Sequence, residues 1–214
     1  MDEITKRLNA CYTGALHDVM RGMGLSDFVL PRDIRPLDPS QKLAGPIMTV
    51  EGRSGAFDAH ETLMGWTGLL SKARTGHVLL CQPHNDSVAL MGELSGETLK
   101  RKGVRGYFVD GGCRDCDFLL EMGFPVWHRF FTPKDIVGKW LPAQFDAPIK
   151  IGDVKIASGD YFLGDRDGAI VIPAAQIEII LAAAEQAMNT ENRVRTAILD
   201  GMEPQEAYVK YGKF

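Results

Sequence analysis

Apolar side chains recur near the start of the chain at the spacing of one helix face. This stripe consists of Ile4, Leu8, Cys11, Ala15 and Val19. Gly22 and Gly24 follow it, and glycine commonly ends a helix. The pattern therefore predicts one opening helix that covers a sheet.

Beyond a proline-containing extended connection at 27–43, short apolar runs alternate with helical patterns. The expected strands are Ala44–Glu51, Val78–Cys81, Gly106–Asp110 and Pro125–Trp127. The expected helices between them cover residues 59–73, 92–102 and about 114–122. Short apolar strands separated by helices of this length predict an α/β fold built from parallel βαβ units, with both sheet faces covered.

The pattern changes after residue 131. Lys150–Ile156 and Gly168–Pro173, which glycine and aspartate turns separate, predict β-hairpin elements. Pro173 suits a helix start, and the apolar stripe that follows consists of Ile177, Ile180, Leu181, Ala184 and Met188. Gly201 is placed to end this helix, and a last short helix is expected from Pro204 to Tyr211.

Composition favours an ordinary globular protein that acts on small molecules. The 214 residues are 45% apolar and 24% charged, and they predict a single domain spanning 1–214. A formal charge of -4 provides no general attraction for nucleic acid. Because no apolar segment is long enough to cross a membrane or to act as a signal peptide, we expect a cytoplasmic protein whose four cysteines are reduced.

The residues best suited to bind a metal ion and a substrate lie in the segment Asp110-Gly-Gly-Cys-Arg-Asp115. The two glycines allow a tight turn after a strand, which delivers Arg114 and Asp115 to the carboxyl edge of the sheet. There an aspartate suits a hard cation and a guanidinium suits an anionic oxygen of the same ligand. The alternative is that Asp115 only complements a helix dipole and Arg114 lies on the surface.

A second helix start lies upstream, at Gly92-Glu93-Leu94-Ser95. Its free backbone N–H groups would point at an anion, and Glu93 adds a carboxylate. In a βαβ unit this helix start reaches the same sheet edge as Arg114, so the two segments are expected to share one pocket. Taken alone, Glu93 is better explained as a helix-stabilising residue.

Several motifs in this order resemble the family of 4-hydroxy-4-methyl-2-oxoglutarate aldolases, which includes the regulator of ribonuclease activity A. Gly92-Glu93-Leu94 precedes Arg114-Asp115 at the family's spacing, and Asp-Gly-Gly stands before that pair. The likeness extends over most of the chain through Leu37–Pro39, Leu43–Pro46, Gly123–Val126 and Gly164–Ala169.

The resemblance implies a swivelling β/β/α domain with N- and C-terminal helices, assembled into homotrimers or homohexamers with active sites between subunits. The helical extension at about 173–214 would pack at a subunit interface, and Glu185 or Glu191 would reach a neighbouring site. Asp115 would be the protein ligand of Mg²⁺ or Mn²⁺, and Arg114 would bind the substrate. The resemblance also implies that the substrate carboxylate is bound by the backbone N–H groups of Gly92, Glu93, Leu94 and Ser95. The Glu93 side chain would orient metal-bound water.

These residues suit a class II pyruvate aldolase acting on a small 2-oxo acid. Cleaving the C3–C4 bond of such an acid leaves a pyruvate enolate, and positive charge from the cation and Arg114 would stabilise its oxygen. Oxaloacetate decarboxylation passes through the same enolate, so we expect that activity as well. The alternative is a non-enzymatic regulator that binds ribonuclease machinery.

Two departures from the family pattern concern the residues around Asp115. Phe118 stands where many aldolase-like members have an acid, and Cys113 where the family has a small apolar residue. Cys113 and Cys116 have the C-x-x-C spacing of redox and zinc sites, which makes a thiol oxidoreductase a third hypothesis. No second C-x-x-C or paired histidine completes a zinc site. His17, His60 and His84 are candidates for contacting the second half of the substrate.

Overall fold

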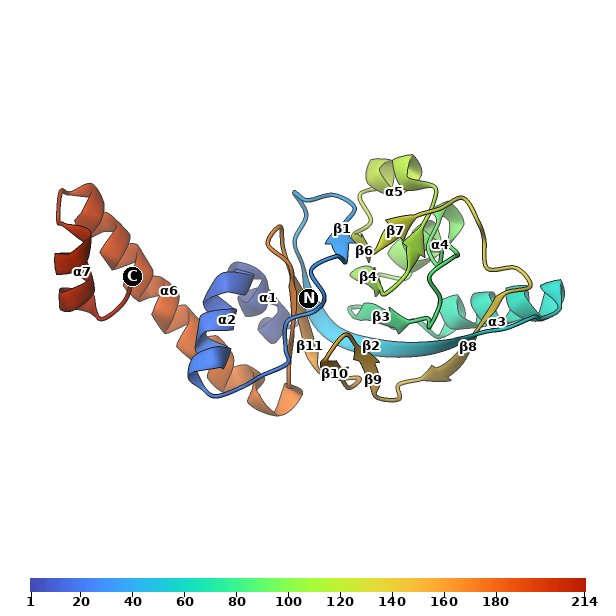
Figure 1. Ribbon diagram of the computed structural model, residues 1–214, viewed down its shortest axis with the longest axis horizontal. Coiled ribbons are helices and arrows are strands. Elements are labelled where there is room, and N and C mark those ends of the chain that lie inside the picture. The colour runs from blue at the N-terminus through green and yellow to red at the C-terminus, as the bar shows by residue number, and fades with distance from the viewer.

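A curled mixed sheet of eight strands runs through the computed structural model, which describes all 214 residues (Figure 1). Its parallel part is formed by β2 (Leu43–Ser54), β3 (Val78–Gln82), β4 (Gly106–Val109) and β6 (Val126–His128). Antiparallel strands complete the sheet: β1 (Arg35–Pro36), β8 (Trp140–Phe145), β11 (Tyr161–Gly164) and β12 (Ala169–Ile172). The predicted parallel βαβ arrangement is confirmed.

Alternate residues of the parallel strands enter two separate cores, as the period of a strand requires. Leu79 and Tyr107 pack with three helices, α3 (Ala59–Lys72), α4 (Glu93–Arg101) and α5 (Cys116–Met122). Leu80 and Phe108 face the other side, where the hairpin of β9 (Ile149–Ile151) and β10 (Val154–Ile156) covers them. Both sheet faces are therefore buried, which explains the continuous apolar runs of these strands.

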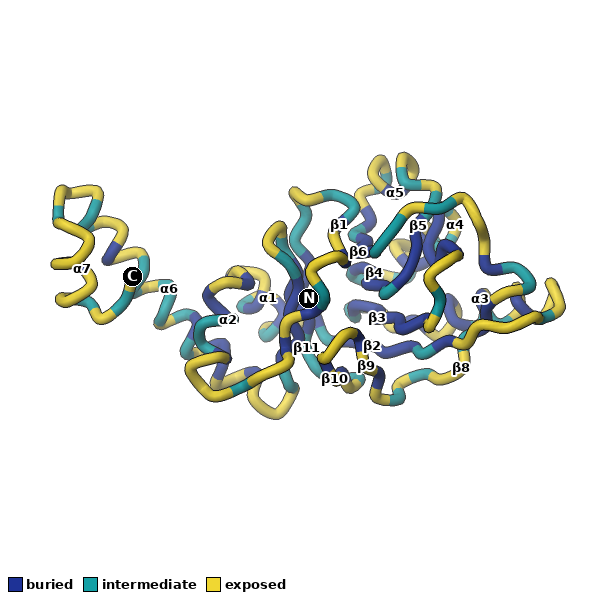
Figure 2. The backbone as a smooth tube through the Cα atoms, viewed as in Figure 1, coloured by how far each residue is buried: buried dark blue, intermediate teal, exposed yellow.

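A third core joins the terminal helices to the antiparallel end of the sheet. It includes residues of α1 (Glu3–Ala10), α2 (Thr13–Gly22) and α6 (Ile177–Leu199) packed on β11 and β12. The outer part of α6 leaves the body of the molecule and turns back through α7 (Pro204–Tyr211) (Figure 1). Figure 2 shows that this outer part is largely exposed. None of the helices combines the length and apolar character needed to cross a membrane.

Two helix predictions were wrong in their boundaries. The expected single opening helix is divided into α1 and α2, because the Asp165 carboxylate accepts hydrogen bonds from Thr13 N (2.8 Å) and Thr13 Oγ1 (2.7 Å). This long-range contact gives α2 its own start. The helix expected from about residue 114 begins at Cys116, so Arg114 and Asp115 belong to the turn before it.

Candidate active site

The glycine turn after β4 brings the two predicted halves of the site together. Gly112 lies in β5 (Gly112–Cys113), which pairs with β7 (Phe130–Phe131), and a Cβ at Gly112 would come within 2.6 Å of the Val88 carbonyl oxygen. This close approach lets Leu90 N donate to Gly112 O at 2.9 Å and Arg114 N donate to Met91 O at 3.0 Å. The chain just before α4 therefore runs beside Arg114.

Asp110 anchors this turn. Its Oδ1 accepts a hydrogen bond from Arg129 Nε at 2.5 Å and forms a salt bridge with Arg129 Nη2 at 2.5 Å, and its Oδ2 accepts a hydrogen bond from Gln82 Nε2 at 2.9 Å. Arg129 N also donates to Gly111 O at 2.8 Å, and its guanidinium pairs with Asp33. Because both carboxylate oxygens of Asp110 are engaged, this residue supports the turn and is not a free ligand.

Arg114 and Asp115 lie against the first residues of α4. The Asp115 Oδ2 atom accepts a hydrogen bond from Glu93 N at 3.2 Å and lies 3.4 Å from Arg114 Nε. A Cβ on Gly92 would come within 2.5 Å of the same oxygen. Asp115 itself is in the left-handed region, with φ 54° and ψ 39°, a conformation that aspartate tolerates better than most residues. The predicted proximity of the two segments is thus present in the structure.

The first turn of α4 keeps backbone donors available for an anion. Its helical hydrogen bonds begin with Gly96 N to Gly92 O, so the N–H groups of Leu94 and Ser95 precede the helical ladder. The side chain of Ser95 is engaged, because its Oγ accepts a bond from Trp66 Nε1 at 2.9 Å. A ligand carboxylate at this helix start would therefore meet backbone N–H groups.

Arg114 is paired with two carboxylates. Its Nη1 atom is 4.0 Å from Asp135 Oδ2, in addition to the contact of its Nε atom with Asp115. The side chains of Arg114 and Asp115 are 39% and 37% exposed, so water screens these pairs and both groups are accessible to a ligand. Sequence reasoning missed Asp135 because it lies twenty-one residues after Arg114, in a loop beyond β7 whose course no local pattern indicates.

The residues fit a largely hydrated Mg²⁺ or Mn²⁺ ion. Both protein contacts of the Asp115 carboxylate fall on Oδ2, which leaves Oδ1 for a further ligand. The structure has no group of three or more His, Cys, Asp or Glu side chains arranged so that they could hold a metal ion. A cation at Asp115 would thus have one protein carboxylate, which agrees with the preference of Mg²⁺ for few carboxylates and several waters.

The two cysteines beside the site are protected thiols. Cys113 is fully buried and Cys116 is half-buried, and neither is in a disulfide. Burial raises the pKa of both thiols, and the contact with Cys116 raises the pKa of Cys113 further. A catalytic redox cysteine needs the opposite shift, so the thiol oxidoreductase hypothesis is disfavoured.

The other candidate residues are paired with neighbouring side chains. Nε2 of His84 is 2.9 Å from Glu51, and Nδ1 of His17 is 3.3 Å from Asp18. Glu185 pairs with Arg7, and Glu191 with Tyr12 and Lys213. A surface hollow of about 700 Å³ lies between α6 and α7, and Arg114 does not line it. A contribution of Glu185 or Glu191 to a neighbouring subunit stays a prediction.

Comparison with known proteins decides the family. The sequence profile described as RraA-like, Aldolase/RraA, matches residues 13–171. The chain belongs to this RraA-like family. A protein of Halalkalibacterium halodurans, provisionally named a 4-hydroxy-4-methyl-2-oxoglutarate aldolase, is 30% identical over 186 residues, covering 85% of this chain and 83% of that protein. The resemblance seen in the sequence is therefore confirmed.

Solved structures of similar proteins confirm the fold of this RraA-like chain. RraAS2 of Streptomyces coelicolor, described as an unusual member of the RNase ES inhibitor RraA family, is 26% identical with a TM-score of 0.81, over 91% of this chain and 96% of that one. A crystal structure described as that of novel cellulases from gut-associated microbes is 31% identical with a TM-score of 0.84, over 90% of this chain and 88% of that one.

Proposed function

We propose that this chain is a divalent-metal-dependent lyase that cleaves the C3–C4 bond of a small 2-oxo acid, in the manner of a 4-hydroxy-4-methyl-2-oxoglutarate aldolase. The observation that carries the proposal is the contact of the Asp115 carboxylate with both Arg114 and the start of α4. The name of the Halalkalibacterium halodurans relative supports the same reaction class.

Arg114 and the start of α4 bind the oxo-acid half of the substrate in this proposal. The guanidinium, already close to Asp115, donates to an anionic oxygen of the substrate, while the N–H groups of Leu94 and Ser95 hold its carboxylate. Asp115 would hold a divalent cation, which would supply further positive charge where the oxo oxygen becomes negative. Fixed charge at this point lowers the barrier because an enolate forms there.

Glu93 is the proposed proton-handling group. Its backbone N–H holds Asp115, whereas its partly exposed side chain is in no salt bridge of the structure. The carboxylate would position a water that takes the proton of the substrate hydroxyl and returns one to the enolate carbon. Oxaloacetate would lose CO₂ at the same site, since its cleavage leaves the same enolate.

The proposal includes assembly into trimers or hexamers, with residues 1–214 as one domain and the extension at 173–214 at a subunit interface. The exposed apolar side chains of α6 and α7 support it, because such surfaces are unfavourable in water. These side chains are Ile179, Leu199, Tyr208 and Val209.

A substrate screen tests the reaction class. The purified chain is mixed with Mg²⁺ and a series of 4-hydroxy-2-oxo acids and oxaloacetate, and pyruvate is followed with a coupled dehydrogenase. We expect metal-dependent release that a chelator abolishes and that Arg114→Lys lowers about 10- to 100-fold in kcat/KM, because lysine loses the planar fork. Release that a chelator leaves unchanged would overturn the proposal.

The second candidate function is a regulator of ribonuclease machinery, which the likeness to RraAS2 supports. It predicts inhibition of a purified RNase E-type enzyme that survives Asp115→Asn. Glycoside hydrolysis is less well supported, because a typical glycosidase places two carboxyl groups on either side of a sugar bond. Here Asp115 and Asp135 are both paired with the Arg114 guanidinium.

A further inference from the structure

Gln82 ends β3 at the carboxyl edge of the sheet, and its side-chain amide is bonded to three different segments. Its Oε1 accepts a hydrogen bond from His84 N at 3.0 Å. Its Nε2 donates to Asp110 Oδ2 at 2.9 Å and to Lys150 O at 3.1 Å. Because the residue is only 8% exposed and both amide hydrogens are engaged, these partners hold the side chain in one orientation.

Two of these contacts connect the segments that carry the proposed site. Asp110 is the last residue before the glycine turn that leads to Asp115. His84 belongs to the loop 83–92, which leads from β3 to the start of α4. A single buried side chain therefore joins the turn to the loop.

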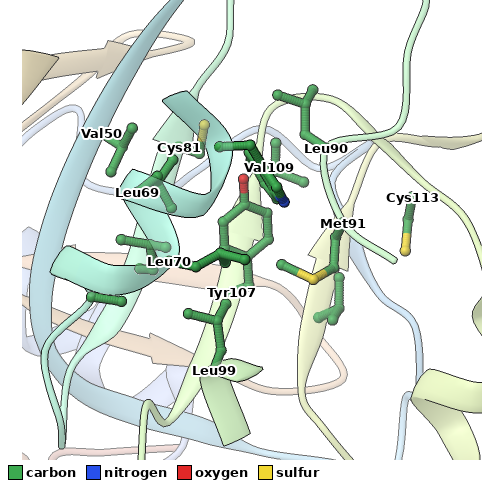
Figure 3. Close-up of a cluster of buried hydrophobic side chains, with 14 of the residues drawn as sticks. Val50, Leu69, Leu70, Cys81, Leu90, Met91, Leu99, Tyr107, Val109 and Cys113 are labelled. Carbon is green, nitrogen blue, oxygen red and sulfur yellow. The ribbon is translucent and has the colours of Figure 1, made fainter. Parts of the chain in front are cut away.

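The far end of this loop is bound to the turn by its backbone. Leu90 N donates to Gly112 O at 2.9 Å, and Arg114 N donates to Met91 O at 3.0 Å. Figure 3 shows the side chains of Leu90 and Met91 in the buried cluster that Cys113 also enters. Both ends of the loop are thus fixed, one by a side chain and the other by the backbone.

We propose that Gln82 is a positioning residue, whose amide holds the start of α4 in place beside Asp115. It acts through Asp110 and the loop 83–92 and contacts no ligand itself. Its effect on the contact between α4 and Asp115 follows from the hydrogen bonds of the chain alone. Its effect on turnover rests on the function proposed above.

The contact that Gln82 maintains is easily broken. Asp115 Oδ2 accepts the hydrogen bond of Glu93 N at 3.2 Å, which is the upper end of the usual range for an N–H donor and an oxygen acceptor. A small displacement of α4 is therefore enough to lose it. Misplacing binding groups by about 1 Å can lower a rate about 100-fold, so such a displacement matters for the proposed reaction.

Glutamine suits this position because its amide offers two donors and an acceptor without a charge. Methionine has nearly the same length, but it would leave Asp110 Oδ2 and His84 N without these partners. Glutamate would keep an acceptor for His84 N but would bring a second carboxylate to Asp110. Both substitutions remove the bond to Asp110 and nearly keep the size of the side chain.

The exchange rate of the Glu93 amide with water tests the positioning role directly, because this N–H is the donor to Asp115. It is measured by NMR on the full chain without added metal, for Gln82→Met and Gln82→Glu. We expect the Glu93 amide to exchange at least about threefold faster in both variants, because their contact with Asp115 is loosened. If Gln82→Met does not fold, Gln82→Glu decides.

Thr49→Val is the matched control. Thr49 is buried in β2, which β3 separates from β4, and its Oγ1 donates to Ala147 O at 2.7 Å. This variant also loses a buried hydrogen bond and should unfold at a lower urea concentration, but its Glu93 amide should exchange within about twofold of the unsubstituted rate. Unchanged exchange in the Gln82 variants, or equal acceleration in Thr49→Val, would refute the positioning role.

Kinetics separate this inference from the proposed reaction. With saturating Mg²⁺ and substrate, at a temperature where each variant is fully folded, kcat for pyruvate release should fall at least about tenfold in Gln82→Met and stay within about twofold in Thr49→Val. Faster Glu93 exchange with an unchanged kcat would refute the effect on turnover. A lack of pyruvate release by the unsubstituted chain would refute the proposed reaction, and the exchange rates would still decide whether Gln82 positions the start of α4.

Discussion

Asp110 lies next to the candidate site but supports its turn instead of binding a ligand. Sequence alone places it one position before the glycine turn, where it resembles a ligand as much as Asp115 does. The structure separates the two, because Asp110 is only 16% exposed and binds Arg129 and Gln82, whereas Asp115 is accessible. The sequence could not show this, since Gln82 ends β3 and Arg129 lies between β6 and β7.

Asp110→Asn should destabilise the fold. The amide cannot accept the two guanidinium bonds as a charged group does, so we expect the free energy of unfolding to fall by about 1–3 kcal/mol in urea denaturation. Asp153→Asn is the control, because this exposed residue has only a surface pair with Lys150. Equal stability of the two variants would show that the Asp110 network does not hold the turn.

His128 gives the fold a dependence on pH. Its side chain is buried beside Phe131, its Nδ1 has no hydrogen-bond partner, and burial lowers its pKa below the usual value of 6.5. The unfolded chain therefore binds this proton more readily than the folded chain. The stability due to neutral His128 is present above pH about 6.5 and is lost as the pH falls toward the lowered pKa.

His128→Phe should weaken this dependence, measured as the difference in the free energy of unfolding between pH 7.5 and pH 5.5. The exposed His60→Gln serves as the control and should keep the dependence of the unsubstituted chain. An unchanged difference in His128→Phe would assign the dependence to other groups.

Helices and strands were predictable where the apolar pattern was local. The last helix has the bounds expected from Pro204 and Tyr211, and the parallel strands lie within about three residues of their predicted ends. The break between α1 and α2 was not predictable, because neither Gly nor Pro occurs at Cys11-Tyr12. Its cause is Asp165, which lies 152 residues away from Thr13. A helix start that depends on a distant carboxylate cannot be recognised from the neighbouring residues of the sequence.

Asp165→Ala should therefore weaken α2. Removing the acceptor of Thr13 N and Thr13 Oγ1 is expected to lower the free energy of unfolding by about 1 kcal/mol, as for an ordinary helix cap. Asp167→Ala, in the same turn, should have a smaller effect because its side chain accepts no hydrogen bond from α2. Loss of amide-exchange protection confined to residues 13–16 would locate the change.

At the scale of the molecule, the sequence predicted which segments lie close together, but it did not predict the side-chain contacts that hold them in place. The glycine pair and the start of α4 were expected at one sheet edge, and the Glu93 N to Asp115 contact lies there. The support from Arg129 and the second carboxylate, Asp135, depends on the tertiary course of the chain after β6. The exposure of apolar side chains on α6 and α7 was likewise not predictable, because these helices have an ordinary amphipathic sequence pattern.

Self-association is the prediction that belongs to this scale. Leu199 and Val209 are 79% and 77% exposed, and burying them between subunits would remove apolar surface from water. Sedimentation velocity should give three or six times the chain mass of 23.6 kDa. The double change Leu199→Glu and Val209→Glu should lower that mass, whereas Lys155→Glu on the β10 hairpin should not. A monomeric unsubstituted chain would contradict the assembly.

The most direct test of the proposed lyase compares two aspartates two residues apart. Initial rates of pyruvate release from 4-hydroxy-4-methyl-2-oxoglutarate with Mg²⁺ are measured for Asp115→Asn and Asp117→Asn. Because Asp115 is the proposed cation ligand and Asp117 is exposed on α5, the first variant should lose about 100-fold or more in kcat and the second should stay within about twofold. Equal rates for Asp115→Asn and the unsubstituted chain would contradict the assignment of this site.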